Sequence, residues 1–437
     1  MPTNNETILG TLASGEFMPL LQADRRRHVY LIGMTGTGKT GLLLNMMHAD
    51  LMAGAGFCFL DPHGDACQHI ASLAPKERSK DVIYLDPSDP THTFAYNPLS
   101  GVSEAERATA AANIVSSFKN IFSNSWGPRL EYILGHSLRL LLDTRDQTLL
   151  GLPRLLVDET YRDWLIVRCA DPVVRSFWQT EYAAYDTRFR NEAIAPIQNK
   201  IGAFLANPFI RSILCQNSST LNIADVMNKG KVLIVNLSKG NLGTEPAHLL
   251  GALLITACSQ AAEARRHIPE HERRDFTLYV DEFQNFATDS FATILSEARK
   301  WRLSLVAANQ TIAGQLSEPL QHAIFGNTGT LIAFRVGALD AKRLAGELGL
   351  SNPTTLTQTN NFHAWVRLMR DGAPTDPHLI QMFSPPFPGL RFEKVVAFGR
   401  STHMMPRRAV EERIAASFPK PPKKRSRHGS KRDADRL

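Results

Sequence analysis

The sequence contains few cysteines and no long hydrophobic run. The five cysteines are scattered and include no Cys-x-x-Cys pair, which argues against a metal role and indicates reduced cytosolic thiols: Cys58, Cys67, Cys169, Cys215 and Cys258. No window approaches the roughly 18 consecutive apolar residues that a membrane-spanning helix needs. Residues 1–10, MPTNNETILG, are polar and lack the apolar core of a signal peptide. These absences predict a cytoplasmic protein.

Net positive charge is scarce outside the C-terminus. The 437 residues are 43% hydrophobic and 21% charged, which is typical of a folded protein with two or three domains. The formal net charge is +7, but residues 420–437 alone hold eight Lys and Arg against two Asp, so the remainder is almost neutral. A basic tail can bind a nucleic-acid backbone, an acidic partner or anionic lipid, or simply keep the protein soluble. We favour nucleic acid.

Residues 28–40, HVYLIGMTGTGKT, predict a strand that ends in a phosphate-binding loop. The pattern G-x-x-x-x-G-K-T places glycines where the backbone can turn its N–H groups toward phosphate oxygens. Lys39 would reach the β and γ phosphates, and the Thr40 hydroxyl would ligate Mg²⁺. The predicted nucleotide-binding residues are therefore Gly33, Thr35, Gly36, Thr37, Gly38, Lys39 and Thr40. The alternative is a glycine-rich turn without a ligand.

A pair of acids follows a second apolar strand, at residues 277–280. A carboxylate at a strand tip beside the phosphate loop can hold Mg²⁺ through water, so Asp281 is the predicted metal residue. The adjacent Glu282 is predicted to orient and deprotonate the attacking water as a general base. The alternative is a pair of surface acids at a strand end.

Two later strands end in further polar residues. The strand at 303–310 ends in Asn309 and Gln310, and buried amides need partners. We predict that Gln310 senses the γ-phosphate and its water; a structural amide bonded to a loop backbone is the alternative. Arg335 lies near the end of the strand at 329–336 and needs an anionic partner, because a guanidinium is always charged. It could complete a neighbouring subunit's nucleotide site in a ring-shaped motor or form a local ion pair.

Two other clusters are less specific. The segment DPHGD, residues 61–65, follows a strand at the sheet edge where ligands bind. Asp61 and His63 could tune the catalytic water or connect nucleotide state to substrate. A metal site there has weak support, because the sequence offers no distant His or Cys cluster. Residues 25–27 are three successive arginines, a pattern typical of a solvated rim.

Apolar runs that alternate with helical stretches predict an α/β fold with a mostly parallel sheet, covered on both faces. Further strands are expected at residues 56–61, 81–86, 231–237 and, at the edge of the sheet, 363–369. From residue 103 to 228 helical spacing dominates, which predicts an inserted all-α domain. We therefore expect a polar N-terminal lead at 1–27, a nucleotide-binding domain at 28–102 and 229–400, and a basic, disordered tail at 401–437.

With these motifs in this order, the chain resembles the FtsK/HerA superfamily of P-loop ATPases. Within it, the chain resembles the soluble part of TraG/TraD-type conjugative coupling proteins of type IV secretion systems. The matching segments, within residues 28–370, are GMTGTGKT, FLDPHGD, WGPRLEYIL, KVLIVNLSKG, LYVDEFQNF, SEARKWRLSLVAANQ and FGNTGTLIAFRVGA. The resemblance implies a RecA-like P-loop NTPase fold and the roles given above for Asp281, Glu282, Gln310 and Arg335.

The resemblance also implies an ATP-hydrolysing, Mg²⁺-dependent, DNA-translocating motor that acts in DNA transfer. Its implied partners are DNA, copies of itself in a hexameric ring, and a relaxase complex or secretion-channel proteins. The nearest alternative is a HerA-like helicase or a DNA-packaging motor. An alternative of another class is a non-translocating recruiter of a relaxase complex that ATP switches. Coupling proteins typically begin with transmembrane helices, which are not seen in this sequence, so peripheral attachment at the inner membrane stays open beside a cytoplasmic location.

Overall fold

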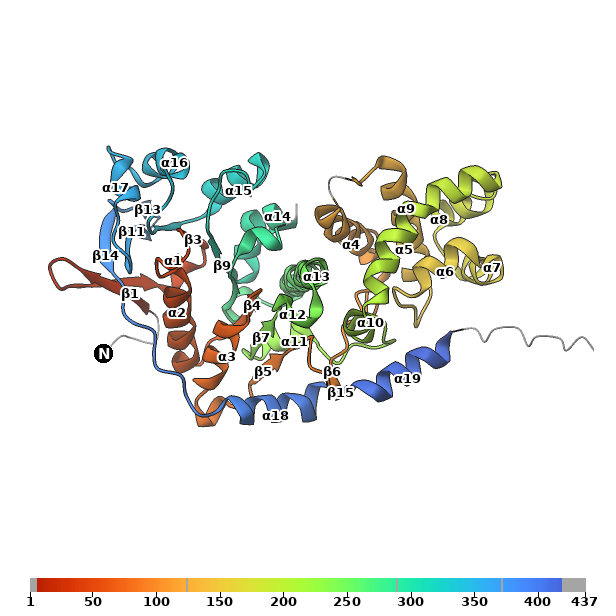
Figure 1. The fold of residues 1–437 in the computed structure, drawn as a ribbon, viewed down its shortest axis with the longest axis horizontal. Coiled ribbons are helices and arrows are strands. Elements are labelled where there is room, and N and C mark those ends of the chain that lie inside the picture. Colours follow the sequence, from red (N-terminus) through yellow and green to blue (C-terminus); the bar gives the residue numbers. More distant parts are fainter. Residues whose placement is uncertain (1–5, 123–124, 288–289, 371, 419–437) are drawn as a thin grey trace, which may run out of the picture.

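The computed structural model describes residues 6–122, 125–287, 290–370 and 372–418, and its centre is one large sheet (Figure 1). Its eleven strands lie in the order β2-β1-β14-β11-β10-β3-β9-β8-β4-β7-β5. The seven strands from β10 to β5 are parallel, and the other four continue the sheet in antiparallel fashion. The predicted α/β fold with a mostly parallel sheet is confirmed. The strands are β1 (Glu6–Leu12), β2 (Phe17–Leu21), β3 (Val29–Ile32), β4 (Gly56–Asp61), β5 (Val82–Leu85), β7 (Val232–Asn236), β8 (Phe276–Val280), β9 (Leu303–Asn309), β10 (Thr330–Ala333), β11 (His363–Arg367) and β14 (His378–Gln381).

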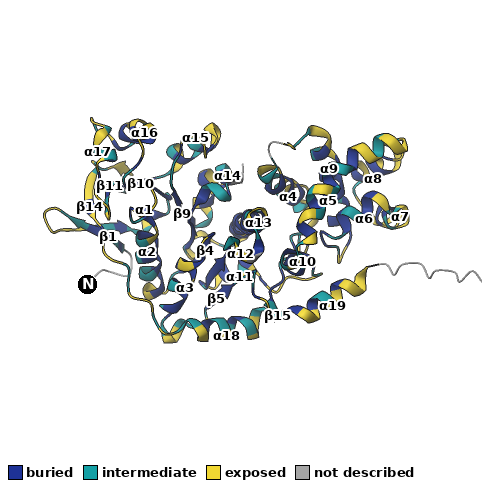
Figure 2. Ribbon diagram, in the orientation of Figure 1, coloured by how far each residue is buried: buried dark blue, intermediate teal, exposed yellow. Residues whose placement is uncertain are grey.

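The parallel strands are buried along their whole length, because helices cover both faces of the sheet (Figure 2). One face packs against α2 (Lys39–Ala53) and α3 (Asp65–Ser72). The other face packs against α13 (Thr244–Glu263), α14 (Ser290–Glu297) and α15 (Glu318–Asn327). Continuous apolar runs in the sequence therefore correspond to strands with no solvent-facing side.

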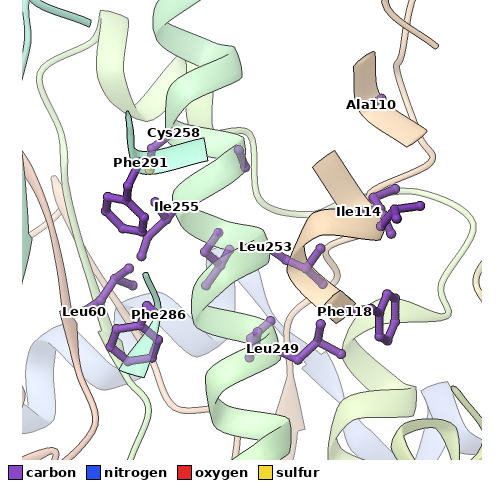
Figure 3. Close-up of a cluster of buried hydrophobic side chains, with 14 of the residues drawn as sticks. Leu60, Ala110, Ile114, Phe118, Leu249, Leu253, Ile255, Cys258, Phe286 and Phe291 are labelled. Carbon is purple, nitrogen blue, oxygen red and sulfur yellow. The ribbon is translucent and has the colours of Figure 1, made fainter. Parts of the chain in front are cut away.

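Helix α13 is buried on almost every side, as expected of a helix that is apolar all round. Figure 3 shows Leu60 of the sheet and Phe286 on one side of it, and Phe118 of α4 (Arg107–Ile121) on the other. These three side chains are all buried. The sheet and the helices inserted into it consequently share one hydrophobic core.

Between β6 (His92–Thr93) and β7, the part of the chain that the structure describes is helical and contains no strand. The helices are α4, α5 (Pro128–Leu142), α6 (Gly151–Val157), α7 (Glu159–Arg168), α8 (Pro172–Ser176), α9 (Thr187–Ala206), α10 (Pro208–Leu214) and α11 (Ile223–Asn228). Polar side chains cap the starts of α7, α8, α9 and α10: Asp158, Asp171, Asp186 and Asn207. These helices fall in the segment expected to be inserted, whose boundaries at 103 and 228 stay a prediction. Within the described ranges, every helix falls short of the length and apolar character needed to cross a bilayer.

Residues 1–27 were expected to form a polar lead outside the sheet, and this prediction is wrong for the described part of the segment. The segment contains β1, β2 and α1 (Gln22–Arg25), and it buries Leu9 and Leu20. Strand β1 pairs with β14, where Thr11 lies opposite Gln381. The partner strand lies so far along the chain that no local pattern reveals the pairing.

The two C-terminal expectations also need correction. Strand β11 is not at the edge of the sheet, because β14 pairs with its outer side and is followed by β1 and β2. The tail expected over 401–437 begins with the end of α18 (Phe392–His403) and with α19 (Arg407–Ser417). Val410 and Ile414, one helical turn apart, are buried on α19. The basic run at 420–437 lies outside the described residues.

Arg25 is buried, contrary to the expectation of a solvated rim. Its terminal nitrogens donate to the two carboxylate oxygens of Asp50 on α2 at 2.8 and 2.7 Å, and one of them also donates to the Tyr279 hydroxyl. Tyr279 donates in turn to Asp50 at 2.9 Å. This bidentate pair satisfies the charge of Arg25 inside the protein and ties α2 to the sheet.

We predict that Arg25→Ala lowers the free energy of unfolding by about 3–5 kcal/mol, because Asp50 would remain buried without its cation. Arg408→Ala is the matched control, since that side chain is 92% exposed and, among the described residues, pairs with Glu412 on the surface of α19. It should cost about 0.5 kcal/mol or less. Denaturant unfolding of both variants measures the difference, and equal effects would contradict a structural role for the buried pair.

Candidate active site

The phosphate loop connects β3 to α2 at the carboxyl edge of the parallel sheet. Gly36 and Gly38 have φ values of 77° and 121°, a region that side-chain-bearing residues rarely adopt. A Cβ at Gly38 would also lie 2.6 Å from the Met382 sulfur, so a side chain there would have to displace the flexible Met382. Inside the loop, the buried Thr37 hydroxyl donates to the Met34 carbonyl at 2.7 Å, whereas Thr35 is exposed. This hydrogen bond within the loop helps to hold its shape.

Lys39 is the buried cation of the site. Its ammonium donates to the carbonyls of Gly33 at 2.7 Å and Met34 at 3.2 Å, and its residue is 6% exposed. Burial lowers the pKa of Lys39, and the charges of Glu282 and Asp281 oppose that effect. The ammonium donates here to neutral carbonyl oxygens. It can exchange them for the oxygens of a bound anion, which are stronger hydrogen-bond acceptors.

Asp281 follows β8 and faces the start of α2. One of its carboxylate oxygens accepts from the Thr40 hydroxyl at 2.9 Å, and the other accepts from the Glu282 backbone N–H at 2.9 Å. Burial, followed by the charge of Asp61, raises the pKa of Asp281 to about 6. Magnesium prefers oxygen ligands, so the Thr40 hydroxyl and the Asp281 carboxylate are a fitting pair of donors for it.

Glu282 lies beside Asp281 and is 7% exposed. Gln310 Nε2 donates to Glu282 Oε1 at 2.6 Å, so the two residues predicted to act together are in contact. Gln284 Nε2 donates to Glu282 Oε2, also at 2.6 Å. Gln284 was not among the predicted site residues; its only signal in the sequence is a polar residue between Phe283 and Phe286, which are buried.

Asp61 completes the acidic side of the site from β4. Its carboxylate accepts from the backbone N–H groups of His63 and Gly64, both at 2.9 Å. Burial raises the pKa of Asp61, and these hydrogen bonds oppose the rise. His63 itself is exposed. The structure therefore separates the two: Asp61 belongs to the buried site and His63 to its surface.

Arg335 follows β10, the strand next to β3. Its backbone carbonyl accepts from Met34 N–H of the phosphate loop at 2.8 Å. Arg335 as a residue is half-buried, and among the residues that the structure describes its guanidinium has neither a hydrogen bond nor an ion pair. The local carboxylate pair considered as an alternative is thus not found in those residues.

A glycine-rich loop between a parallel strand and a helix, with a Lys-Thr pair and an acid pair on a nearby strand tip, defines a P-loop nucleoside triphosphatase architecture. The chain belongs to the family of type IV secretion-system coupling protein DNA-binding domains, whose family model matches residues 12–361. This confirms the family that the sequence motifs indicated.

The chain is also similar to individual relatives. It is 20% identical to the type 4 coupling protein DotL of Legionella pneumophila over 74% of its own length, but it spans only 49% of DotL. The solved bacterial conjugative coupling protein TrwBΔN70 superposes with a TM-score of 0.66 at 16% identity, covering 90% of this chain and 91% of that one. VirB4 of Thermoanaerobacter pseudethanolicus gives a TM-score of 0.57 at 13% identity, covering 88% and 98%. These structures establish the fold.

Asp281 supplies a test of the site's electrostatics. Because its folded pKa is raised, the neutral form is favoured and the ionised form at high pH costs stability. We predict that Asp281→Asn, without ligands at pH 8, raises the free energy of unfolding by on the order of 1–3 kcal/mol. The gain should shrink as the pH falls below about 6.

Denaturant unfolding at pH 8 and pH 4.5 measures this effect. Asp65→Asn, at an exposed position nearby, should show no comparable gain. A gain for Asp281→Asn that does not depend on pH would contradict the assigned burial of charge.

Proposed function

We propose that this chain is an Mg²⁺-dependent ATPase that translocates DNA, acting in DNA transfer as a coupling-protein motor. The observation that carries the proposal is the contact of Gln310 with Glu282 beside the phosphate loop. Hydrolysis needs a base and a γ-phosphate contact at one place, whereas binding alone needs neither. The relatives add support, since TrwB has been solved with GDPNP, with ADPNP, and with ADP and Mg²⁺.

Each residue then has one task. The loop N–H groups and Lys39 hold the β and γ phosphates. Thr40 and Asp281 hold Mg²⁺, which when bound neutralises charge on the phosphate oxygens. Glu282 orients a water and takes its proton, while Gln310 contacts that water and the γ-phosphate. The water oxygen bonds to the γ-phosphorus, and the bond from that phosphorus to the β–γ bridging oxygen breaks, leaving ADP and phosphate.

The remaining assignments follow the same proposal. Residues 28–102 and 229–400 form the nucleotide-binding domain, and the insertion at 103–228 contacts DNA or partner proteins. The basic run at 420–437 adds phosphate contacts that do not depend on sequence. The chain assembles as a hexameric ring in the cytoplasm, peripheral to the inner membrane, and works with a relaxase complex or secretion-channel proteins.

A recruiter that uses ATP only as an assembly switch is the second candidate. It would need nucleotide binding but no general base, so the buried Glu282 beside Gln310 favours hydrolysis. A helicase or packaging role is less favoured, because the family match is to coupling proteins.

We predict that Glu282→Gln binds ATP normally but hydrolyses it at least about 10²-fold more slowly, because the base is lost. Lys39→Ala should instead weaken nucleotide binding. Fluorescent-nucleotide titration and phosphate release separate the two effects, with Asp65→Asn as a surface-acid control. Turnover close to wild type in Glu282→Gln would remove that residue from the mechanism.

We further predict that Arg335 completes the nucleotide site of a neighbouring subunit, since its guanidinium has no partner among the described residues of its own chain. An arginine at the transferring phosphate can contribute about 10³-fold to the rate. Arg335→Ala should therefore bind ATP yet hydrolyse it poorly. Mixing it with Lys39→Ala should restore partial activity, because some interfaces would pair an intact loop with an intact arginine.

A mixture of Lys39→Ala with Glu282→Gln is the matched control. Lys39 and Glu282 belong to the nucleotide site of one and the same subunit. In this mixture no subunit carries both residues intact, so no complete site forms and activity should stay lost. If mixed rings form and the Arg335→Ala mixture is also inactive, Arg335 does not act across subunits.

A further inference from the structure

Both oxygens of the Glu282 carboxylate already accept hydrogen bonds. Gln310 donates to Oε1 and Gln284 donates to Oε2, each at 2.6 Å. Bonds to an ionised acceptor are about twice as strong as neutral ones. A general base must accept a hydrogen bond from water, and each amide occupies one acceptor site of the oxygen to which it donates and fixes the direction of the carboxylate. The two glutamine amides therefore restrain Glu282, the proposed general base.

The backbone of Glu282 is fixed, so a release of the base must come from side chains. Glu282 has φ 48° and ψ 50°, the left-handed region. Its N–H donates to the Asp281 carboxylate at 2.9 Å, and its carbonyl accepts from Asn285 N–H at 2.9 Å. With both backbone groups held, the carboxylate can change partners only through side-chain rotation, and a turn of Gln284 or Gln310 frees it without moving Glu282 itself.

Gln284 is poorly satisfied where it stands. Its carbonyl oxygen Oε1 is buried and has no hydrogen-bond partner among the described residues. A buried acceptor without a donor is unfavourable, because it has lost its bonds to water and gained none in return. The present rotamer of Gln284 is therefore held mainly by its bond to Glu282, and a competing ligand has less to overcome.

Gln284 also lines a cleft of about 560 Å³ between the helical insertion and the sheet domain. Ser116, Lys119 and Asn120 of α4 form one wall, and Gln315 and Ser317, from the segment that leads into α15, contribute to the other. These side chains offer hydroxyl, amide and ammonium donors, and no described residue of the lining is a carboxylate.

That chemistry fits a phosphodiester backbone. Amides, hydroxyls and lysines are the groups that hold phosphate oxygens without reading sequence. Lys119 is also paired with Glu131 at 3.1 Å, so its charge is shared and the amides supply much of the recognition. Because the chain matches a DNA-binding family, we take DNA as the ligand that these side chains would bind.

We propose that Gln284 is a positioning residue that restrains Glu282 until a DNA backbone enters this cleft. A DNA phosphate then accepts the hydrogen bond that the Gln284 amide had donated to Glu282. The inference rests on the proposed ATPase function. Gln310 leaves Glu282 for the γ-phosphate when ATP binds, and Gln284 leaves it for a DNA phosphate. Glu282 is then free of both restraints only when ATP and DNA are bound together. ATP hydrolysis is thereby coupled to DNA binding.

The test is the ATPase rate of Gln284→Met, which keeps the side-chain volume but removes the amide. Without DNA, kcat should rise about tenfold over wild type, while the KM for ATP stays within about twofold. The stimulation by a defined duplex and by its single strand should fall in proportion, because the DNA-bound rate is already unrestrained. Asn285→Ala, in the same turn with no described side-chain hydrogen bond, is the matched control and should leave both rates unchanged.

A second variant tests the cleft independently. Asn120→Ala combined with Gln315→Ala should leave the DNA-free rate unchanged and reduce the stimulation by DNA. If Gln284→Met lowers the DNA-free and DNA-bound rates in parallel, or changes neither, the restraint is disproved although the ATPase function stands. If neither wild type nor Gln284→Met hydrolyses ATP under any condition, the proposed function itself fails and the inference fails with it.

Discussion

The active site depends on keeping one cation and three carboxylates buried together at the carboxyl edge of the sheet. Lys39 comes from the helix after β3, Asp281 and Glu282 follow β8, and Asp61 ends β4. These groups meet because neighbouring parallel strands end at one edge, and the register of β4 with β8 sets Asp61 and Asp281 side by side. Buried charges are costly unless each has partners. Here hydroxyl, amide and backbone donors supply them.

The second constraint is the shared core around α13, which leaves the helical insertion little freedom to move independently. Packing of α4 on α13 places the cleft next to Gln284, two residues beyond Glu282. The C-terminal helices reinforce this link, since α18 lies along β5 and α19 along α10 (Figure 1). Arg407 anchors α19 through bonds to the Asp89 carbonyl at 2.9 Å and the Ser212 hydroxyl at 2.5 Å. Events in the insertion can therefore reach the site through packed elements.

Features encoded in adjacent residues could be predicted from the sequence, whereas those that need distant partners could not. The phosphate loop and the Asp281–Glu282 pair follow their strands directly, and Gln310 was expected at a neighbouring tip. Strand β1 was missed because its partner β14 lies near the other end of the chain. Arg25 was predicted to be solvated because its partners, Asp50 and Tyr279, lie far from it in the sequence. Gln284 was missed because its role depends on side-chain direction within one short turn.

The most direct test of the proposed function is the ATP hydrolysis rate of the wild-type chain, measured with Mg²⁺ in the presence and absence of single- and double-stranded DNA. The proposed function and the proposed restraint on Glu282 predict slow turnover without DNA, a several-fold or greater increase with DNA, and no turnover when Mg²⁺ is chelated. A protein that binds ATP but does not hydrolyse it under any of these conditions would contradict the motor and favour an ATP-dependent recruiter.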